Sequence, residues 1–214
     1  MSESAPPGPA ASDAASSADA ARGLSAAIRR SGLDATGRSG EPATSMEYRV
    51  DAEGTVRRLG LVLAQLHRTE LNAAELGAVL GPLELVERAR RSVERPLADR
   101  PPRSASYRHV DDPRLVAILE GGASRVAQRS TRTALTHGRP TLGTLWCFRG
   151  DALGLLGWAE AAIGDPHRDL AVAAGSIAAE FTPMLVPAFV DAYALFSPDV
   201  VAMDWYALAA ELTR

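Results

Sequence analysis

The stretch Leu135-Thr136-His137-Gly138-Arg139-Pro140-Thr141-Leu142-Gly143-Thr144 decides the fold. The residues at 133–136 predict a short strand, and the glycine and proline that follow predict a loop. Two apolar runs come next, Thr144–Phe148 and Leu153–Trp158, joined by the polar turn Arg149-Gly150-Asp151. Two such runs around a short polar turn predict a β-hairpin.

Helical signals flank this β region. Upstream, one apolar face recurs at i, i+3, i+4 and i+7 and consists of Leu59, Val62, Leu63 and Leu66. Asn72, with Glu75 three residues on, predicts the capped start of a short helix through Leu80. A third helix is predicted over Leu83–Arg95. Asp112 is predicted to cap a fourth helix, with Pro113 at its first position.

Downstream of the hairpin, the pattern predicts helices at about 166–180, 184–195 and 198–213. The predicted fold class is therefore α+β and mostly helical, with one small β-hairpin.

The first part of the chain has a different composition. Residues 1–45 consist mainly of Ala, Ser, Pro and Gly with scattered charges, and they contain no aromatic residue. Such a segment buries too little apolar surface to offset its ordering entropy. We therefore expect a disordered tail over 1–45, with no more than a transient helical turn at Leu24–Arg30, and an ordered domain over 46–214 that begins with a β-like run at 46–50.

Composition excludes several classes of protein. The net charge of −3 gives no electrostatic case for a nucleic-acid partner. No apolar run approaches the ~18 residues of a membrane span, and the N-terminus lacks a signal core, so we expect no membrane association and a cytoplasmic location. The single cysteine, Cys147, excludes an internal disulfide and a cysteine zinc cluster, and its apolar neighbours predict a buried strand position.

The basic residues have one further peculiarity. All 23 are arginine, so no step that needs a lysine ammonium can occur in this chain. The densest basic segment is interleaved with Glu84, Glu87, Glu94 and Asp99, and this pattern favours a salt-bridged helix face over a nucleic-acid site. Its arginines are Arg88, Arg90, Arg91, Arg95, Arg100, Arg103 and Arg108.

Three segments in order resemble the aminoglycoside phosphotransferase and choline-kinase-like family, which has a protein-kinase-like fold. They are Leu135–Thr144, Gly154–Glu160 and Gly164–Ala171, and they resemble the family's L-T-H-G-D-x-x-x-x-N loop, I-D-W strand end and G-D-P-x-x-D-L-A helix start. Leu66-His67 and Phe189–Tyr193 also resemble family motifs. The resemblance covers residues ~55–214 and implies the C-terminal lobe of such a kinase, with the N-terminal lobe apparently absent.

Three positions at which the family carries catalytic or metal-binding residues hold other residue types in this chain. The resemblance implies a catalytic aspartate where Arg139 stands, a Mg²⁺-binding asparagine where Thr144 stands and a metal-binding aspartate where Gly157 stands. An arginine accepts no proton at working pH, and a glycine offers Mg²⁺ no side-chain ligand. The active site is thus predicted to be degenerate, with none of its catalytic positions intact and no metal site.

The remnant binding candidates of the cleft are His137, Arg139, Asp165 and Asp169. Each also has a structural interpretation. His137 would tie down the loop, Asp165 and Asp169 would cap or brace a helix start, and Arg139 would be a solvated replacement.

The predicted function is that of a catalytically inactive phosphotransferase-like protein, a pseudokinase with a binding or regulatory role. The alternative is an active small-molecule kinase of an aminoglycoside, choline or sugar-like hydroxyl, with relocated groups or completed by a partner chain; Asp151, Asp165 and Asp169 are the nearby acids that could substitute. A third possibility is a decaying gene product. No cofactor is expected, and Mg²⁺ and ATP enter only under the alternative.

Loss of an N-terminal lobe is expected to uncover apolar residues. The candidates are Leu142, Leu145 and Trp146, with Leu59 and Val62 on the first helix. We therefore expect a homodimer or another protein to cover this surface, in preference to the polar N-terminal segment. A small-molecule ligand in the old cleft is also possible.

Overall fold

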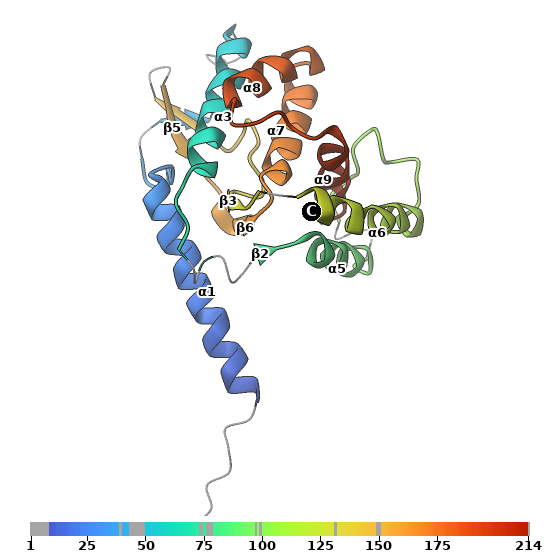
Figure 1. Ribbon diagram of the computed structural model, residues 1–214. Helices are drawn as coiled ribbons and strands as arrows, with labels where there is room; N and C mark the ends of the chain where they lie inside the picture. The colour runs from blue at the N-terminus through green and yellow to red at the C-terminus, as the bar shows by residue number, and fades with distance from the viewer. Residues whose placement is uncertain are drawn as a thin grey trace, which may run out of the picture.

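The computed structural model describes residues 9–38, 40–42, 50–72, 75, 79–96, 98, 100–130, 132–148 and 151–213. Within these ranges it contains seven α-helices and two small three-stranded sheets (Figure 1). The predicted α+β, mostly helical class is confirmed. Among the described residues, no helix is both long enough and apolar enough to cross a bilayer.

The first core forms around α3 (Ala52–His67), which begins where Asp51 accepts a hydrogen bond from the Gly54 amide at 3.0 Å. The four apolar residues predicted to share one face, Leu59, Val62, Leu63 and Leu66, are all buried. This face packs against α8 (Val186–Tyr193) and the small sheets. The helical period of the sequence was therefore interpreted correctly.

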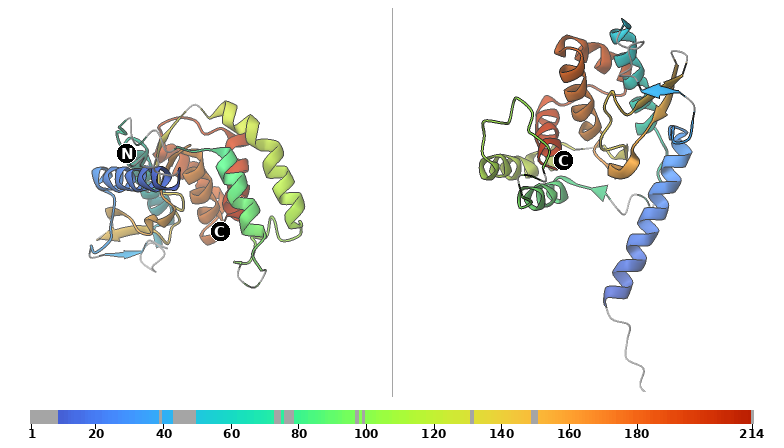
Figure 2. Two further views of the ribbon diagram at one scale, coloured as in Figure 1. Left: turned by 90° about the horizontal axis from the view of Figure 1, so that it is seen from below. Right: turned by 180° about the vertical axis from the view of Figure 1, so that it is seen from behind.

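One sheet carries the predicted hairpin. Strands β4 (Leu145–Phe148) and β5 (Asp151–Leu155) are antiparallel, and the short β1 (Glu41–Pro42) pairs with the other side of β4. In the view from behind, β1 lies beside the hairpin (Figure 2).

The second sheet has the order β2-β6-β3. The predicted strand β3 (Ala134–Thr136) runs antiparallel to β6 (Ala162–Gly164), and β2 (Val79–Leu80) runs parallel to β6. Strands of two or three residues are too short to show a period of two, so the sequence did not reveal β1, β2 or β6.

The short helix predicted from Asn72 through Leu80 is wrong at its end, because Val79 and Leu80 form strand β2. The capping pair itself is present: Asn72 Oδ1 accepts from the Glu75 amide at 3.0 Å, and Glu75 Oε2 accepts from the Asn72 amide at 2.8 Å. Residues 73, 74 and 76–78 lie outside the described ranges.

A second core lies between α5 (Pro82–Val93), α6 (Asp112–Arg129) and α9 (Val200–Leu212). Helix α7 (His167–Glu180) joins the two cores, because Leu170, Ala173 and Ile177 belong to the first and Ala171 to the second. Figure 1 shows α7 between α3 and α9. Short 3₁₀ turns at Trp158–Glu160 and Pro183–Leu185 complete the described elements.

The start of α6 corrects one assignment. The capping residue is Asp111, whose Oδ1 accepts from the Arg114 amide at 2.8 Å, and Asp112 is the first helical residue. The Asp112 carboxylate instead forms ion pairs with Arg100 and Arg103. Two adjacent aspartates can each serve as a cap, and here the tertiary ion pairs determine which one does.

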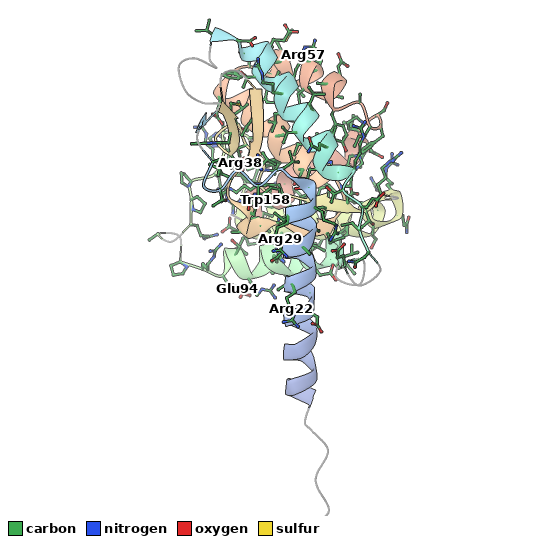
Figure 3. All side chains as sticks on the ribbon, turned by 90° about the vertical axis from the view of Figure 1, so that its left-hand side faces the viewer. Arg22, Arg29, Arg38, Arg57, Glu94 and Trp158 are labelled. Carbon is green, nitrogen blue, oxygen red and sulfur yellow. The ribbon has the colours of Figure 1, made fainter. Side chains whose placement is uncertain are left out.

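The prediction of a disordered tail over 1–45 is wrong for the part of it that packs on the body. Helix α1 spans Pro9–Ser31, and the side chains of Ala27, Leu33 and Ala35 are buried. Alanine has the highest helix propensity, and Leu24 and Ile28 lie one turn apart, so the helix presents an apolar edge to the first core. Figure 3 shows Arg29 on the part of α1 that lies level with the body and Arg22 on the part that projects beyond it. Residues 1–8, and the strand start predicted near 46–50 except Val50, lie outside the described ranges.

The N-terminal segment also joins the hairpin. The Leu155 amide donates to Leu33 O at 2.7 Å, and the Ala35 amide donates to Leu155 O at 3.0 Å. Arg30 pairs with the buried Glu75 at 2.7 Å. A segment whose backbone and charges are bonded in this way is part of the folded domain.

This packing contradicts the expectation that the chain exposes an apolar surface. Leu59, Val62, Leu142 and Leu145 are buried within the chain itself, and Trp146 is half-buried. The N-terminal segment contributes to the covering, which was the outcome judged least favourable from its polarity. The homodimer and the partner protein remain predictions without this argument behind them.

Candidate functional site

The loop after β3 is anchored by one buried carboxylate. Asp169, fully buried on the first turn of α7, accepts hydrogen bonds from the His137 amide and the Gly138 amide, both at 2.7 Å. Its Oδ2 also lies 3.2 Å from Nε2 of His67, whose Nδ1 is 2.9 Å from the Tyr193 hydroxyl. Burial acts to raise the pKa of Asp169, but the His67 hydrogen bond and the nearby histidine and arginine charges outweigh it and lower the pKa.

His137 is also fully engaged. Its Nε2 is 2.9 Å from Leu156 O, a carbonyl that only accepts, so Nε2 carries the proton. Its Nδ1 then accepts from the Arg139 amide at 3.3 Å, and the ring packs edge-on against Trp158. Burial lowers the pKa of His137, which keeps the ring neutral. Both nitrogens therefore hold the loop, which is the structural interpretation of this residue.

Asp165 performs a similar task at the start of α7. Its Oδ1 accepts from the His167 amide at 2.8 Å and from His167 Nδ1 at 2.7 Å, and His167 Nε2 accepts from the Asp199 amide at 2.9 Å. Burial acts to raise the pKa of Asp165, and the hydrogen bonds from His167 outweigh it and lower the pKa. Asp165 and Asp169 are close in sequence but face different networks.

The three positions at which the family's catalytic residues are replaced are Arg139 and Thr144 in this loop and Gly157 just after β5. They lie on the open side of the loop. A Cβ added at Gly157 would lie 4.0 Å from Thr144 Cγ2, so these two residues are neighbours. The Thr144 hydroxyl accepts from the Thr141 amide and donates to Thr141 O, both at 2.9 Å. The Arg139 side chain is exposed and makes no ion pair with any described residue.

This donor set does not fit a Mg²⁺ ion. Mg²⁺ in proteins is held by carboxylates together with phosphates and water. Here the Thr144 hydroxyl is occupied by the loop backbone, Gly157 has no side chain, and Arg139 brings a positive charge. The described residues contain no group of three or more His, Cys, Asp or Glu side chains placed to hold a metal.

Beside the loop lies a cleft of about 610 Å³. Gly138, Arg139 and Thr141 form one wall, and small residues of α7 and α9 form the floor. The volume falls within the range of about 300–1,000 Å³ that is usual for small-molecule sites. Of the four predicted binding candidates, only Arg139 lines this cleft; His137, Asp165 and Asp169 are buried and do not line it.

Several cleft residues were not predicted from the sequence. They come from distant segments and are Tyr107, Glu160, Arg168, Glu180, Tyr206 and Glu211. Arg168 is buried, donates to Glu160 O at 3.0 Å and lies close behind Gly138. Glu160 and Arg168 lie inside segments that resemble family motifs, but those motifs do not mark them as cleft residues. The meeting of all six depends on how α7, α9 and the 104–107 segment pack.

Comparison with known proteins decides the family. The model of the phosphotransferase enzyme family matches residues 7–206. The chain belongs to this family. No curated protein matches it.

Solved structures of the family share the fold. An aminoglycoside phosphotransferase APH(3'')-Id from Streptomyces rimosus is 19% identical over 82% of this chain and 67% of that chain, with a TM-score of 0.68. Macrolide 2'-phosphotransferase MphH from Brachybacterium faecium is 22% identical over 79% and 57%, with a TM-score of 0.53. Choline kinase LicA from Streptococcus pneumoniae is 15% identical over 74% and 52%, with a TM-score of 0.52. The chain thus spans about half to two thirds of their length, and the suspected family is confirmed.

Proposed function

We propose that this member of the phosphotransferase family binds a small molecule in the cleft beside Arg139 and does not transfer phosphate to it. The observation that supports the proposal is the convergence of Arg139, Thr144 and Gly157 on the open side of the loop. The family's chemistry needs a base and metal ligands at these positions, and none of the three side chains supplies either.

The missing base has a calculable consequence. General-base catalysis contributes about 10²–10⁴ in rate, and a fixed guanidinium in its place also repels the cation that the reaction requires. The acids considered as substitutes are committed elsewhere, because Asp165 and Asp169 are buried and bonded to the loop and helix start. The side chain of Asp151 lies outside the described ranges. Asp165 and Asp169 therefore give no support to the active-kinase alternative.

The test is a thermal melt of the full chain with millimolar Mg·ATP, run beside an active aminoglycoside phosphotransferase. A ligand at 100 times its Kd adds about 2.7 kcal/mol of stability, which at about 2–4 °C per kcal/mol is a shift of several degrees. We expect that shift in the active enzyme and none here. A reproducible shift in this chain, or phosphorylation of an aminoglycoside, choline or sugar hydroxyl, would refute the proposal.

A variant with three substitutions tests the same site. The triple change Arg139→Asp, Thr144→Asn, Gly157→Asp restores the family's letters, and we expect it to remain inactive because the chain has no lysine for the nucleotide phosphates. Phosphoryl transfer by this variant would show that the scaffold still holds a nucleotide.

A further inference from the structure

Residues 24–35, called the N-terminal strap below, run from the last turns of α1 to the hairpin and lie against the first core. Ala27, Leu33 and Ala35 are buried, whereas Arg29 and Gly32 are exposed. The rest of α1 projects beyond the body (Figure 3). Proteins open locally where a segment has few buried apolar contacts and exposed backbone hydrogen bonds. The strap is therefore suited to open while the remainder of the domain stays folded.

An ion pair fastens the strap to the body. Arg30 Nη2 lies 2.8 and 2.7 Å from the two carboxylate oxygens of Glu75, and it donates to Glu70 O at 3.0 Å. The Glu75 side chain is fully buried, whereas 43% of the Arg30 side chain is exposed. Releasing the strap would leave the buried carboxylate without this cation, which is costly. The Arg30–Glu75 pair thus favours the docked position of the strap.

The strap meets the hairpin at Leu155, the last residue of β5. The Leu155 amide donates to Leu33 O at 2.7 Å, and the Leu155 carbonyl accepts from the Ala35 amide at 3.0 Å. A Cβ added at the preceding Gly154 would lie 2.0 Å from Leu33 O, so the strap backbone runs directly against the strand. The same Leu155 carbonyl also accepts from Trp158 Nε1 at 3.0 Å. The strap and Trp158 are therefore held by one acceptor.

The next residues of the chain hold the loop after β3. The Trp158 ring packs edge-on against the His137 ring, with centroids 4.8 Å apart. Leu156 O accepts from His137 Nε2 at 2.9 Å, and the Leu156 amide donates to Thr144 O at 2.9 Å. Residues 155–158 thus contact the strap on one side and both ends of the loop on the other.

We propose that the N-terminal strap regulates the cleft beside Arg139. When it is docked, the strap holds residues 155–158 and, through them, the loop; when it is released, the cleft wall loosens and binds its ligand more weakly. Gly138 and Arg139 line the cleft, so a shift of the loop changes the wall directly. A ligand that needs the ordered wall also favours the docked strap, because coupling between two sites is reciprocal. This consequence for ligand binding rests on the proposed function.

The test is amide hydrogen exchange of the full chain, followed at single residues by NMR and without ligand. A hydrogen bond to a charged group contributes enough that Arg30→Ala should speed exchange of the Ala35 and Leu155 amides about tenfold or more. We expect the His137 and Leu156 amides to speed up by a similar factor and the amides of α6 to stay unchanged.

The matched control is Arg29→Ala, which removes the exposed arginine next to Arg30 in the same last turn of α1. This variant should exchange like the natural chain. Faster exchange in the strap alone would show a local brace without control of the loop, and it would overturn the proposal. No change in Arg30→Ala, an equal change in Arg29→Ala, or a uniform rise that includes α6 would overturn it as well.

A conservative variant tests the coupling from the loop side and guards against misfolding. Trp158→Phe keeps an aromatic ring against His137 and removes the indole N–H that donates to Leu155 O. Reciprocity predicts several-fold faster exchange of the Leu33 amide, which donates within the strap to Ser31 Oγ at 3.2 Å. Unchanged exchange at Leu33 would contradict the proposal. Since no ligand or nucleotide is present, these results are independent of the Mg·ATP melt that tests the proposed function.

Discussion

The loop at 137–144 has two sides that differ in almost every respect. On its buried side, the His137 and Gly138 amides donate to one carboxylate, that of Asp169, and each partner is bonded in turn. On its open side, Arg139 makes no ion pair with any residue that the structure describes, and the neighbouring Gly157, which follows β5, has no side chain. The buried side carries the residues that match the family's motif, and the open side carries those that differ from it. Buried charged networks are costly to break, whereas exposed positions tolerate substitution, so stability alone preserves the first side and not the second.

The largest effect is expected from Asp169→Ala. This change leaves two backbone amides and His67 without their acceptor in a buried site, and removing one partner of a buried charged network typically costs about 3–5 kcal/mol. Urea unfolding monitored by tryptophan fluorescence measures the loss. A cost below about 1 kcal/mol, the typical point-mutant value, would break the comparison, because the buried side would then be no more constrained than the open one.

A pair of glycine substitutions sharpens the comparison at matched backbone geometry. Gly138 and Gly157 have φ values of 84° and 80°, so alanine at either costs about 1–2 kcal/mol of left-handed strain. At Gly138 the new Cβ would also lie 2.2 Å from Glu160 O, and overpacking adds about 1–3 kcal/mol, whereas at Gly157 nothing lies closer than 4.0 Å. We expect Gly138→Ala to lose more stability than Gly157→Ala in the same denaturation experiment. Equal losses would indicate that the contact with Glu160 relaxes without cost.

The third prediction concerns the loss of folding stability at acidic pH. The pKa of Asp169 is lowered in the folded state relative to about 3.9 in the unfolded chain. A depressed folded pKa contributes stability that is present above the unfolded value and is lost as pH falls through the folded value. Between pH 4 and 2, Asp169→Asn should therefore lose stability less steeply than the natural chain, by up to about 1.4 kcal/mol per pH unit. Parallel curves from urea titrations at each pH would contradict the assignment.

The smallest effect is expected from Arg139→Ala. An exposed side chain that makes no ion pair with the described residues contributes within about 0.5 kcal/mol, so the variant should unfold like the natural chain. Its measurable consequence belongs to function: a ligand found for the cleft should bind this variant more weakly. A clear loss of stability would show that Arg139 has a structural partner in solution.

Part of the site could be read from local signals. The resemblance marked Arg139, Thr144 and Gly157 as the positions where the family's catalytic residues are replaced, and the structure brings Thr144 and Gly157 together. The cleft positions of Arg168 and Glu211 were not predictable. Arg168 lies inside a segment that resembles a family motif, but that motif indicates a helix start and not a cleft residue, and no motif surrounds Glu211. The N-terminal segment was misjudged because polarity was weighed and the contact of Leu24 and Ile28 with the core was not.

By itself, the sequence determined some of the elements and the residue types at the catalytic positions: the apolar period of α3, the proline at the start of α6, and the absence of a base and metal ligands at Arg139, Thr144 and Gly157. Only the tertiary structure decided that Asp111 and not Asp112 caps α6, that residues 24–35 pack on the body, and that six arginines of the densest basic segment converge on two hollows. The physical reason is the distance along the chain over which each kind of interaction acts. Backbone propensity and side-chain identity act within a few residues, whereas burial, ion pairing and cavity formation depend on contacts between segments far apart in the chain.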